Sequence, residues 1–459
     1  MPWFAVASAL LGAFQFGYNT GVMNAPKRQM QESFGVADNA VWDWQYTVIV
    51  SMFCVGGFFG ALAGGPLASR LGRRPAILFT GVVFIVAGVL EASAGGYRAM
   101  SLGRVLVGIG SGVATTVVPA YLVEVSPAER RGGMGTLVQF TVTVAILVST
   151  LFGFAINKSN WWMLFAFPAC LGAVQVLSYP VLVETKEGSG GSGGGSSRGL
   201  GSSGRQKGSG DEEALLGNAT DDDSSNGAIA SVLRLLSTAI DREALFISMG
   251  MMACQQLSGI NCVIYYSTSI FSSAGMHSPL LAACLVNGVN VIMTQISASA
   301  VDRAGRRVLM MAGCGGMLLS ALLLTLVFNM TALAGGGLTV VFTMSFVAFF
   351  AIGPGSIPWF YVSELFDADM RPTAASIAGG FNWICNFIVG ISFLPMQSVL
   401  GRIFFGDASE GSRVVFVPFI AVLCVCLVFL LHVPETKNRS VEQIREAMQS
   451  RRRRRGSRD

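Results

Sequence analysis

A short charged motif that occurs twice constrains the fold of this chain more than any other feature. Arg70-Leu71-Gly72-Arg73-Arg74 follows one long apolar run, and Arg303-Ala304-Gly305-Arg306-Arg307 follows another in the second half of the chain. Two further landmarks recur in the same order. Tyr121, Glu124 and Arg131 return with identical spacing as Tyr361, Glu364 and Arg371, and Glu184-Thr185-Lys186 returns as Glu435-Thr436-Lys437. Three landmarks repeated in one order indicate a duplicated half.

The composition indicates that both halves lie in a membrane. Of 459 residues, 52% are hydrophobic and only 12% are charged, whereas a soluble protein carries about 25% charged residues. Twelve apolar runs reach the roughly 20 residues that cross a bilayer as a helix. We expect these spans at 3–24, 44–68, 75–93, 99–122, 133–157, 162–183, 243–271, 279–301, 307–331, 336–361, 372–398 and 413–433. The predicted fold is an all-α membrane protein of twelve helices in two pseudo-symmetric six-helix bundles.

Loop composition predicts the domain order and the orientation. Residues 187–227 are rich in Gly, Ser and acidic residues and should be disordered, and 228–240 reads as a helix along the membrane face. We therefore expect four segments: a bundle at 1–186, a linker at 187–240, a second bundle at 241–433 and a basic tail at 434–459. When the loops between the predicted spans are numbered in chain order, the even-numbered loops contain more basic residues than the odd-numbered loops. Because basic loops lie on the cytosolic side, we expect the even-numbered loops and both termini in the cytosol. We expect a multi-pass protein of the plasma membrane.

The remaining composition argues against several other functions. Much of the net charge of +5 comes from Arg451 to Arg455 and Arg458, so no basic folded domain is present to bind nucleic acid. All nine cysteines lie in apolar runs without a CxxC pair, and His277 and His432 stand alone. We therefore expect neither disulfides nor a metal site. The spans contain no nucleophile–base pair or phosphate loop, so the sequence indicates neither an enzyme nor a cofactor.

Polar residues inside the predicted spans are mostly amides. They are Gln139, Gln255, Gln256, Asn261, Asn290, Asn382 and Asn386, with Trp359 and Trp383 beside them. Asn382 and Asn386 are four residues apart and share a helix face, whereas Gln256 and Asn261 are five apart, which requires a loosened helix that Gly259 permits. Amides donate and accept hydrogen bonds, and tryptophan offers a flat apolar surface, so this set suits a neutral ligand with many hydroxyls. The alternative is that the amides only join helices, at about 0.6 kcal/mol per hydrogen bond.

The repeated arginines and glutamates lie at the ends of spans. Arg70, Arg73 and Arg74 are expected to pair with Glu124 or Glu364 when the cytosolic side of the protein is closed, and these pairs would break when it opens. The alternative is that the arginines only orient the chain in the membrane. Because acids and bases recur together in both halves, we favour a role in gating.

Six strings give the chain a resemblance to a known family. They are QFGYNTGV at 15–22, VPAYLVEVSP at 118–127, QQLSGIN at 255–261, YYSTSIF at 265–271, GPGSIPWF at 353–360 and PETK at 434–437. Together they resemble the sugar porter branch of the major facilitator superfamily, and within it the facilitative glucose and hexose transporters. The resemblance covers the whole chain except the linker and the arginine tail, and it implies transport by alternating access of two bundles around a central hexose site.

The resemblance also implies roles for particular residues. Sugar contacts are implied at Gln139, Gln255, Gln256, Asn261, Asn290, Trp359, Asn382 and Asn386. Tyr265 and Tyr266 resemble an outer gate. A cytosolic charge network is implied at Arg73, Arg74, Glu124, Arg131, Arg306, Arg307, Glu364 and Arg371.

Two positions bear on mechanism and specificity. Proton-coupled sugar porters resemble Phe-Gly-Tyr-Asp in the first span, whereas this chain has Asn19, and an amide carries no proton at neutral pH. Glucose-selective relatives resemble Phe-Phe-Glu before Gly-Pro-Gly, whereas this chain has Ala351 and lacks that acceptor for sugar hydroxyls. Fructose carriers look like Ala there but usually lack the tryptophan that this chain keeps as Trp359. We therefore expect a uniporter for a broad range of hexoses.

Two other functions remain as alternatives. A proton-coupled sugar or polyol symporter differs from the expected uniporter at Asn19. A sugar sensor would signal through its cytosolic segments, but the segments 187–227 and 434–459 are too short and polar to form a signalling domain.

Overall fold

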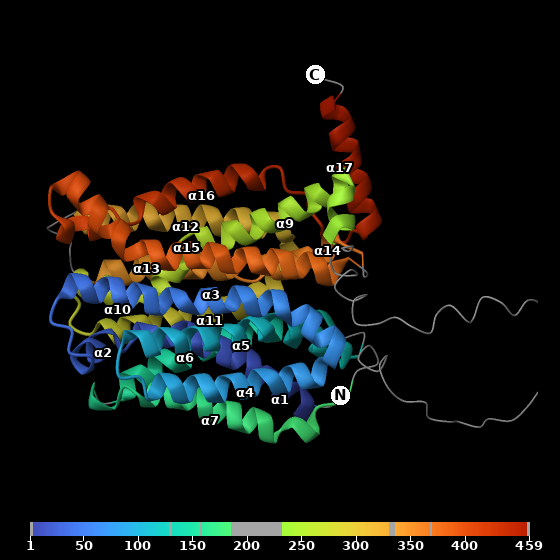
Figure 1. Cartoon of the computed structure of the whole chain (residues 1–459). Helices are drawn as coiled ribbons and strands as arrows, with labels where there is room; N and C mark the ends of the chain where they lie inside the picture. Colours follow the sequence, from blue (N-terminus) through green and yellow to red (C-terminus); the bar gives the residue numbers. More distant parts are fainter. Residues whose placement is uncertain are drawn as a thin grey trace, which may run out of the picture.

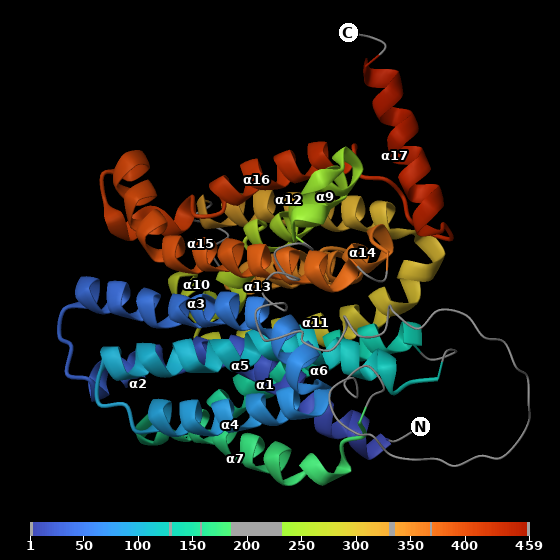
Figure 2. The same ribbon diagram turned by 45° about the vertical axis from the view of Figure 1, so that its right-hand side comes forward.

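The computed structural model describes residues 3–127, 131–156, 158–184, 232–329, 336–367 and 370–456. Within these ranges the chain is helical and contains no strand, which confirms the predicted all-α class. Long helices run side by side (Figure 1), and in both views most helices of the first half of the chain lie in the lower part and most of the second half in the upper part (Figure 2).

The first group of long helices belongs to the first half of the chain. They are α1 (Trp3–Gly21), α3 (Asn39–Leu71), α4 (Arg73–Ala92), α5 (Tyr97–Glu124), α6 (Arg131–Ala155) and α7 (Met163–Leu177). The second group holds α9 (Ala239–Leu257), α10 (Ile260–Ser273), α11 (Pro279–Ala304), α12 (Arg306–Asn329), α13 (Gly336–Ile352), α14 (Ile357–Leu365), α15 (Arg371–Phe405) and α16 (Val417–Leu430). Shorter elements lie at the ends of both groups: η1 (Val22–Asn24), α2 (Lys27–Ser33), η3 (Lys158–Asn160), η4 (Tyr179–Val181), η7 (Ala408–Arg413) and α17 (Val441–Gly456).

The two ends of the assembly differ in their chemistry. One end, here called the charged end, carries Arg73 and Arg306 at the starts of α4 and α12, and both chain termini lie beside it (Figure 1). The opposite end carries α2 and is called the α2 end. Helix α1 starts at the charged end, and α3 runs back and finishes there before α4 begins.

The outer surface of the assembly fits a bilayer. Among the described residues, nine helical segments are long and apolar enough to cross a membrane. The other three of the twelve expected spans correspond to α1, the shorter α7 and the pair α9–α10, which are not among these nine. Many large apolar side chains, such as Phe4, Leu177 and Val425, are exposed on the outer surface. Soluble proteins rarely expose so much apolar surface, so this surface is suited to contact with lipid.

The structure departs from the predicted spans at three places. The seventh span is broken into α9 and α10, as the five-residue step between Gln256 and Asn261 suggested, and Gly259 has φ +92° at the break. The tenth span was predicted as one run over 336–361, but it divides into α13 and α14 around Gly353-Pro354-Gly355. The predicted basic tail contains a helix, α17, which the span analysis did not anticipate.

Within the first half, the closest helix contact is between α3 and α5. Glycines on both helices allow it. A Cβ atom built on Gly60 of α3 would lie 2.2 Å from the carbonyl oxygen of Ile109, and one built on Gly112 of α5 would lie 2.3 Å from that of Gly57. Small residues let backbones approach closely in membranes, where dispersion rather than the hydrophobic effect drives packing. The glycines therefore bring the backbones of α3 and α5 into direct contact.

The two halves meet along α3 and α15 and along α6 and α11. Trp383 of α15 is buried and packs edge-on against Phe16 and Phe53 of the first half, with ring centroids 5.6 and 5.3 Å away. The interface therefore crosses the middle of the molecule, where the candidate site residues were expected.

We predict that Gly60→Ala destabilises the protein by about 1–3 kcal/mol, because the added methyl group forces α3 away from α5. The matched control is Gly315→Ala on α12, whose added Cβ has no neighbour within 4 Å. Thermal unfolding of the purified protein in detergent should show a lower midpoint for the first variant only. Equal midpoints would contradict the close-packing argument.

Candidate functional site

Four of the predicted amides form one hydrogen-bonded group. Gln255, Gln256 and Asn261 come from the break between α9 and α10, and Asn382 comes from the middle of α15. The Nε2 of Gln256 donates to Oδ1 of Asn382 over 2.9 Å, and Nδ2 of Asn382 donates to Oε1 of Gln255 over 2.7 Å. Asn261 donates to Oε1 of Gln256. These residues, here called the amide layer, are at most 8% exposed.

The amide layer also joins the two helix breaks of the second half. The Nε2 of Gln255 donates to the carbonyl oxygens of Pro354 and Gly355 over 2.7 and 2.9 Å. Those carbonyls lie in the turn between α13 and α14, where no helical donor reaches them. A side chain from one broken helix therefore satisfies the backbone of the other.

The other predicted contacts lie apart from this group. Asn386 accepts from the Tyr265 hydroxyl over 3.1 Å. Asn290 is 2% exposed, and its Oδ1 has no partner in the part of the chain that the structure describes. Gln139 and Trp359 are half-buried and make no hydrogen bond to the amide layer among the described residues. The structure thus brings together four of the eight predicted sugar contacts.

The two predicted gate tyrosines face the interface between the halves. The Tyr265 hydroxyl lies 4.0 Å from Sγ of Cys54 on α3 of the first half. Tyr266 donates to the carbonyl oxygen of Gly390 over 3.2 Å, and its ring stacks on Phe393 at 5.0 Å. Both side chains are almost fully buried.

Hydrogen bonds join the two halves at the α2 end. Asn24 of η1 donates to the Ser267 hydroxyl over 2.7 Å and accepts from the Thr268 backbone N–H over 3.0 Å. Nearby, Asn287 of α11 donates to Thr150 of α6 over 3.0 Å. The Thr268 hydroxyl adds a further link by donating to the carbonyl oxygen of Asn24 over 2.6 Å. The structure is therefore closed at the α2 end.

Sequence reasoning missed this closure. Asn24, Thr268 and Asn287 are polar residues near span ends, where solvated side chains are common, so nothing in the sequence marks them as partners. The only available signal was that Asn24 follows the string at 15–22 and that Thr268 lies within the string at 265–271.

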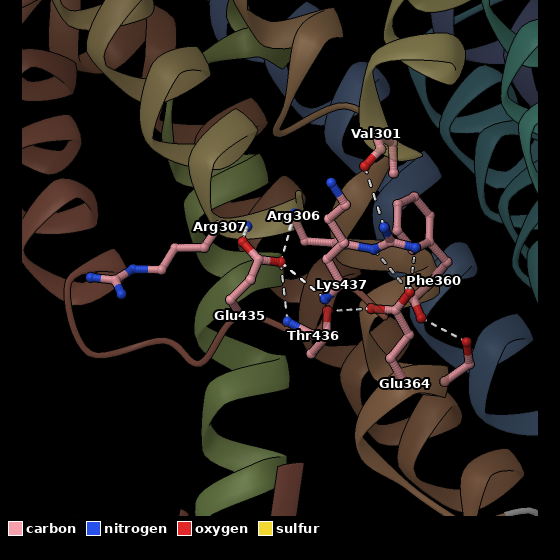
Figure 3. A network of polar contacts seen from close by, with 9 residues as sticks. Val301, Arg306, Arg307, Phe360, Glu364, Glu435, Thr436 and Lys437 are labelled. Carbon is pink, nitrogen blue, oxygen red and sulfur yellow. Dashed lines mark hydrogen bonds and ion pairs between the residues drawn. The ribbon is translucent and has the colours of Figure 1, made fainter. Parts of the chain in front are cut away.

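The charged end of the second half holds a polar network (Figure 3). Arg306 pairs with Glu364 through Nε and Nη2 at 3.0 and 2.9 Å. Glu435 accepts from the backbone N–H groups of Arg306 and Arg307 over 2.9 and 3.1 Å and so caps the start of α12. Lys437 donates to the carbonyl oxygen of Arg303 over 2.6 Å. The network ties the start of α12 and the segment 435–437 to α14.

The first half repeats the core of this network. Arg73 pairs with Glu124 through Nε at 3.0 Å, as Arg306 does with Glu364. The Tyr121 hydroxyl donates to the carbonyl oxygen of Val183, as that of Tyr361 does to Pro434. The turns before α4 and α12 agree as well, since Gly72 and Gly305 both have φ +93°. The sequence repeat is therefore a structural repeat.

The remaining charged residues show where the expected pairing differs. One expectation was that an arginine of the first half pairs with Glu364 of the second half. In the structure Arg73 pairs with Glu124 and Arg306 pairs with Glu364, so each pair lies within one half. Arg74 stacks on Tyr179 at 4.3 Å, and Arg307 donates to the carbonyl oxygens of Leu430 and Leu431. Arg371 donates to the carbonyl oxygen of Phe366 over 3.3 Å. The side chain of Arg131 lies outside the described part of the structure.

Comparisons with known proteins agree with this geometry. The family described as "Sugar (and other) transporter" matches residues 4–448. Facilitated glucose transporter member 3 of solute carrier family 2 from Mus musculus is 35% identical over 474 residues, which cover 97% of this chain and 92% of that protein. Member 4 from Mus musculus is 34% identical over 480 residues, covering 96% and 90%.

Solved structures match over the whole length of the chain. The inward-open xylose transporter XylE from E. coli has a TM-score of 0.74 and is 22% identical, with coverage of 98% of this chain and 100% of that chain. The major facilitator superfamily proton:xylose symporter XylE bound to 6-bromo-6-deoxy-D-glucose has a TM-score of 0.74 at 22% identity, covering 97% and 98%. These structures show the major facilitator fold, as the sequence predicted.

We predict that Gln256→Ala weakens hexose binding about three- to tenfold, because one neutral hydrogen bond contributes about 0.5–1.5 kcal/mol. The control is Thr325→Val on α12, whose hydroxyl donates only within its own helix, to Ala321. Tryptophan fluorescence titration with glucose should separate the two variants. Unchanged affinity in Gln256→Ala would show that the amide layer only joins helices.

Proposed function

The chain belongs to the family of sugar (and other) transporters, whose members are transporters rather than enzymes, and on that premise we propose that it carries hexoses across a membrane by facilitated diffusion. The observation that carries this proposal is the buried, uncharged amide layer at the meeting of two helix breaks. Discontinuous helices near the bilayer midplane are where transporters of this architecture bind substrate.

The chemistry of the amide layer suits a sugar. Each amide both donates and accepts, and so does each sugar hydroxyl. In the absence of ligand, Gln255, Gln256, Asn261 and Asn382 satisfy one another. A hexose entering between them would exchange these hydrogen bonds for new ones at little net cost. The unpartnered Oδ1 of Asn290 would accept from a further hydroxyl. Gln139, Trp359 and Asn386 complete the proposed binding site.

Uniport rather than symport is supported by the first span and by the relatives. Asn19 cannot carry a proton, and the curated relatives at 34–35% identity are named facilitated glucose transporters. The solved symporters are less than 25% identical to this chain and bear on the fold alone. Proton-coupled sugar transport remains the second candidate, because those symporters share the fold.

The proposed mechanism is alternating access. The closed α2 end would open when Asn24 leaves Ser267 and Thr268, while the halves approach each other at the charged end. The ion pairs Arg73–Glu124 and Arg306–Glu364 would then keep the end of each half rigid. We propose that Arg74, Arg131, Arg307 and Arg371 take part in this gating. From the loop charges, we propose that the charged end and both termini face the cytosol. We further propose that the membrane is the plasma membrane.

The substrate range is open to a direct test. Uptake of radiolabelled glucose into proteoliposomes should equilibrate without exceeding the outside concentration, and fructose should inhibit it about as well as unlabelled glucose. Ala351→Glu should raise the preference for glucose about tenfold, because it adds a charged acceptor near the site. Absence of glucose uptake would contradict the proposed function. Failure of fructose to inhibit would contradict the broad substrate range.

A further inference from the structure

A buried ion pair lies in the first half, away from the proposed sugar site. Glu91 of α4 and Arg104 of α5 both have no exposed surface, and Nη1 of Arg104 lies 3.8 Å from Oε1 of Glu91. Both carboxylate oxygens of Glu91 lack a hydrogen bond among the described residues. A buried cation is costly unless an opposite charge lies close by, so each member of this pair depends on the other.

Arg104 reaches the first span as well. Its Nη2 donates to the carbonyl oxygen of Asn19 over 2.8 Å, and its guanidinium lies over the ring of Phe53 of α3 at 4.6 Å. Position 19 is therefore adjacent to the cation, and an acid at that position would be a second possible counter-ion. Asn19 itself is neutral; its Nδ2 donates to the carbonyl oxygen of Gln15, and its Oδ1 has no hydrogen-bond partner among the residues that the structure describes.

Among the described residues, no group other than Glu91 supplies a negative charge next to Arg104. Tyr46 and Cys54 of α3 and Tyr265 of α10 interact electrostatically with Arg104, but these side chains are normally neutral at pH 7. Helices α1 and α7, which also pack on α4, contain no charged residue. Glu91 is thus the one carboxylate facing Arg104 in the part of the chain described.

The two possible positions for the counter-ion, 19 on α1 and 91 on α4, differ in whether their helix contacts the second half. Helix α4 makes its substantial contacts with α1, α3, α5 and α7, all within the first half. By contrast, α1 and the following η1 also contact α10 of the second half. Glu91 is packed tightly, since a Cβ built on Gly103 would lie 2.4 Å from its Cγ. An acid at 19 would border the surface that opens during transport, whereas Glu91 lies behind it.

We propose that Glu91 is a fixed counter-ion that neutralises Arg104 from inside the first half and so removes the need for a proton-exchanging acid on α1. This inference rests on the proposed function, because it explains why that function is uniport. Glu91 is a positioning residue: it touches neither the sugar nor the sugar-binding residues.

The test moves the carboxylate from α4 back to α1. Glu91→Gln should lower hexose uptake about tenfold or more and lower the thermal unfolding midpoint by several degrees, because it leaves Arg104 buried without a counter-ion. The double variant Asn19→Asp/Glu91→Gln should recover the midpoint and most of the uptake. Its uptake should also become dependent on a proton gradient, which a purely structural role would not produce. Glu32→Gln, which removes an exposed carboxylate paired with Arg28, is the control.

Three results would overturn the inference. The first is normal uptake and stability of Glu91→Gln. The second is a double variant that recovers but ignores the proton gradient. The third is that the unaltered protein accumulates hexose when a proton gradient is imposed and that Glu91→Gln abolishes this accumulation. Glu91 would then carry the proton itself. If the unaltered protein takes up no hexose, the proposed function fails, while the unfolding midpoints of the three variants still test whether Glu91 is the counter-ion.

Discussion

Burying a polar group in these apolar bundles costs free energy unless the group finds a partner, and the arrangement of the broken helices depends on that cost. Broken helices free backbone carbonyls in a region where water is scarce, and Gln255 satisfies those of Pro354 and Gly355. The same amide also joins the layer around Asn382. One set of side chains thus stabilises the breaks and supplies the donors and acceptors that a neutral polyhydroxyl ligand needs. Under the proposed function, the hydrogen bonds that hold the breaks together without ligand are the ones that a bound sugar would replace.

Charge is kept away from that layer. The repeated pairs Arg73–Glu124 and Arg306–Glu364 lie at the charged end, and Arg104 is neutralised by Glu91 within the first half. The route proposed for the sugar is therefore lined by uncharged groups. Each of these three pairs is contained in one half, so a movement of the halves relative to each other need not separate them. The few hydrogen bonds at the α2 end, around Asn24, are the ones that such a movement must break.

Much of this organisation could be predicted from the sequence, because it follows from period, spacing and composition. The repeat predicted two equivalent halves, and the five-residue step across Gly259 predicted the break in the seventh span. Spacing alone could not decide whether Arg73 meets an acid of its own half or of the other, since both acids stand in equivalent places. The contact of Asn24 with Thr268 and the pairing of Glu91 with Arg104 depend on how helices pack, which hydropathy does not encode. Helix α17 was missed because its anchor, Arg445 paired with Asp241 and Asp367, joins residues far apart in the chain.

The central claim is that the two halves move as units to expose the site at alternate ends. Spin–spin distances between paired labels test it most directly, in a background in which the exposed Cys170 and Cys424 are serine. One pair, at Val41 and Ile403, reports on the α2 end, and another, at Leu71 and Leu431, reports on the charged end; all four positions are exposed. Alternating access predicts that saturating hexose changes the two distance distributions in opposite directions. Distances that stay fixed, or that lengthen together, would contradict it.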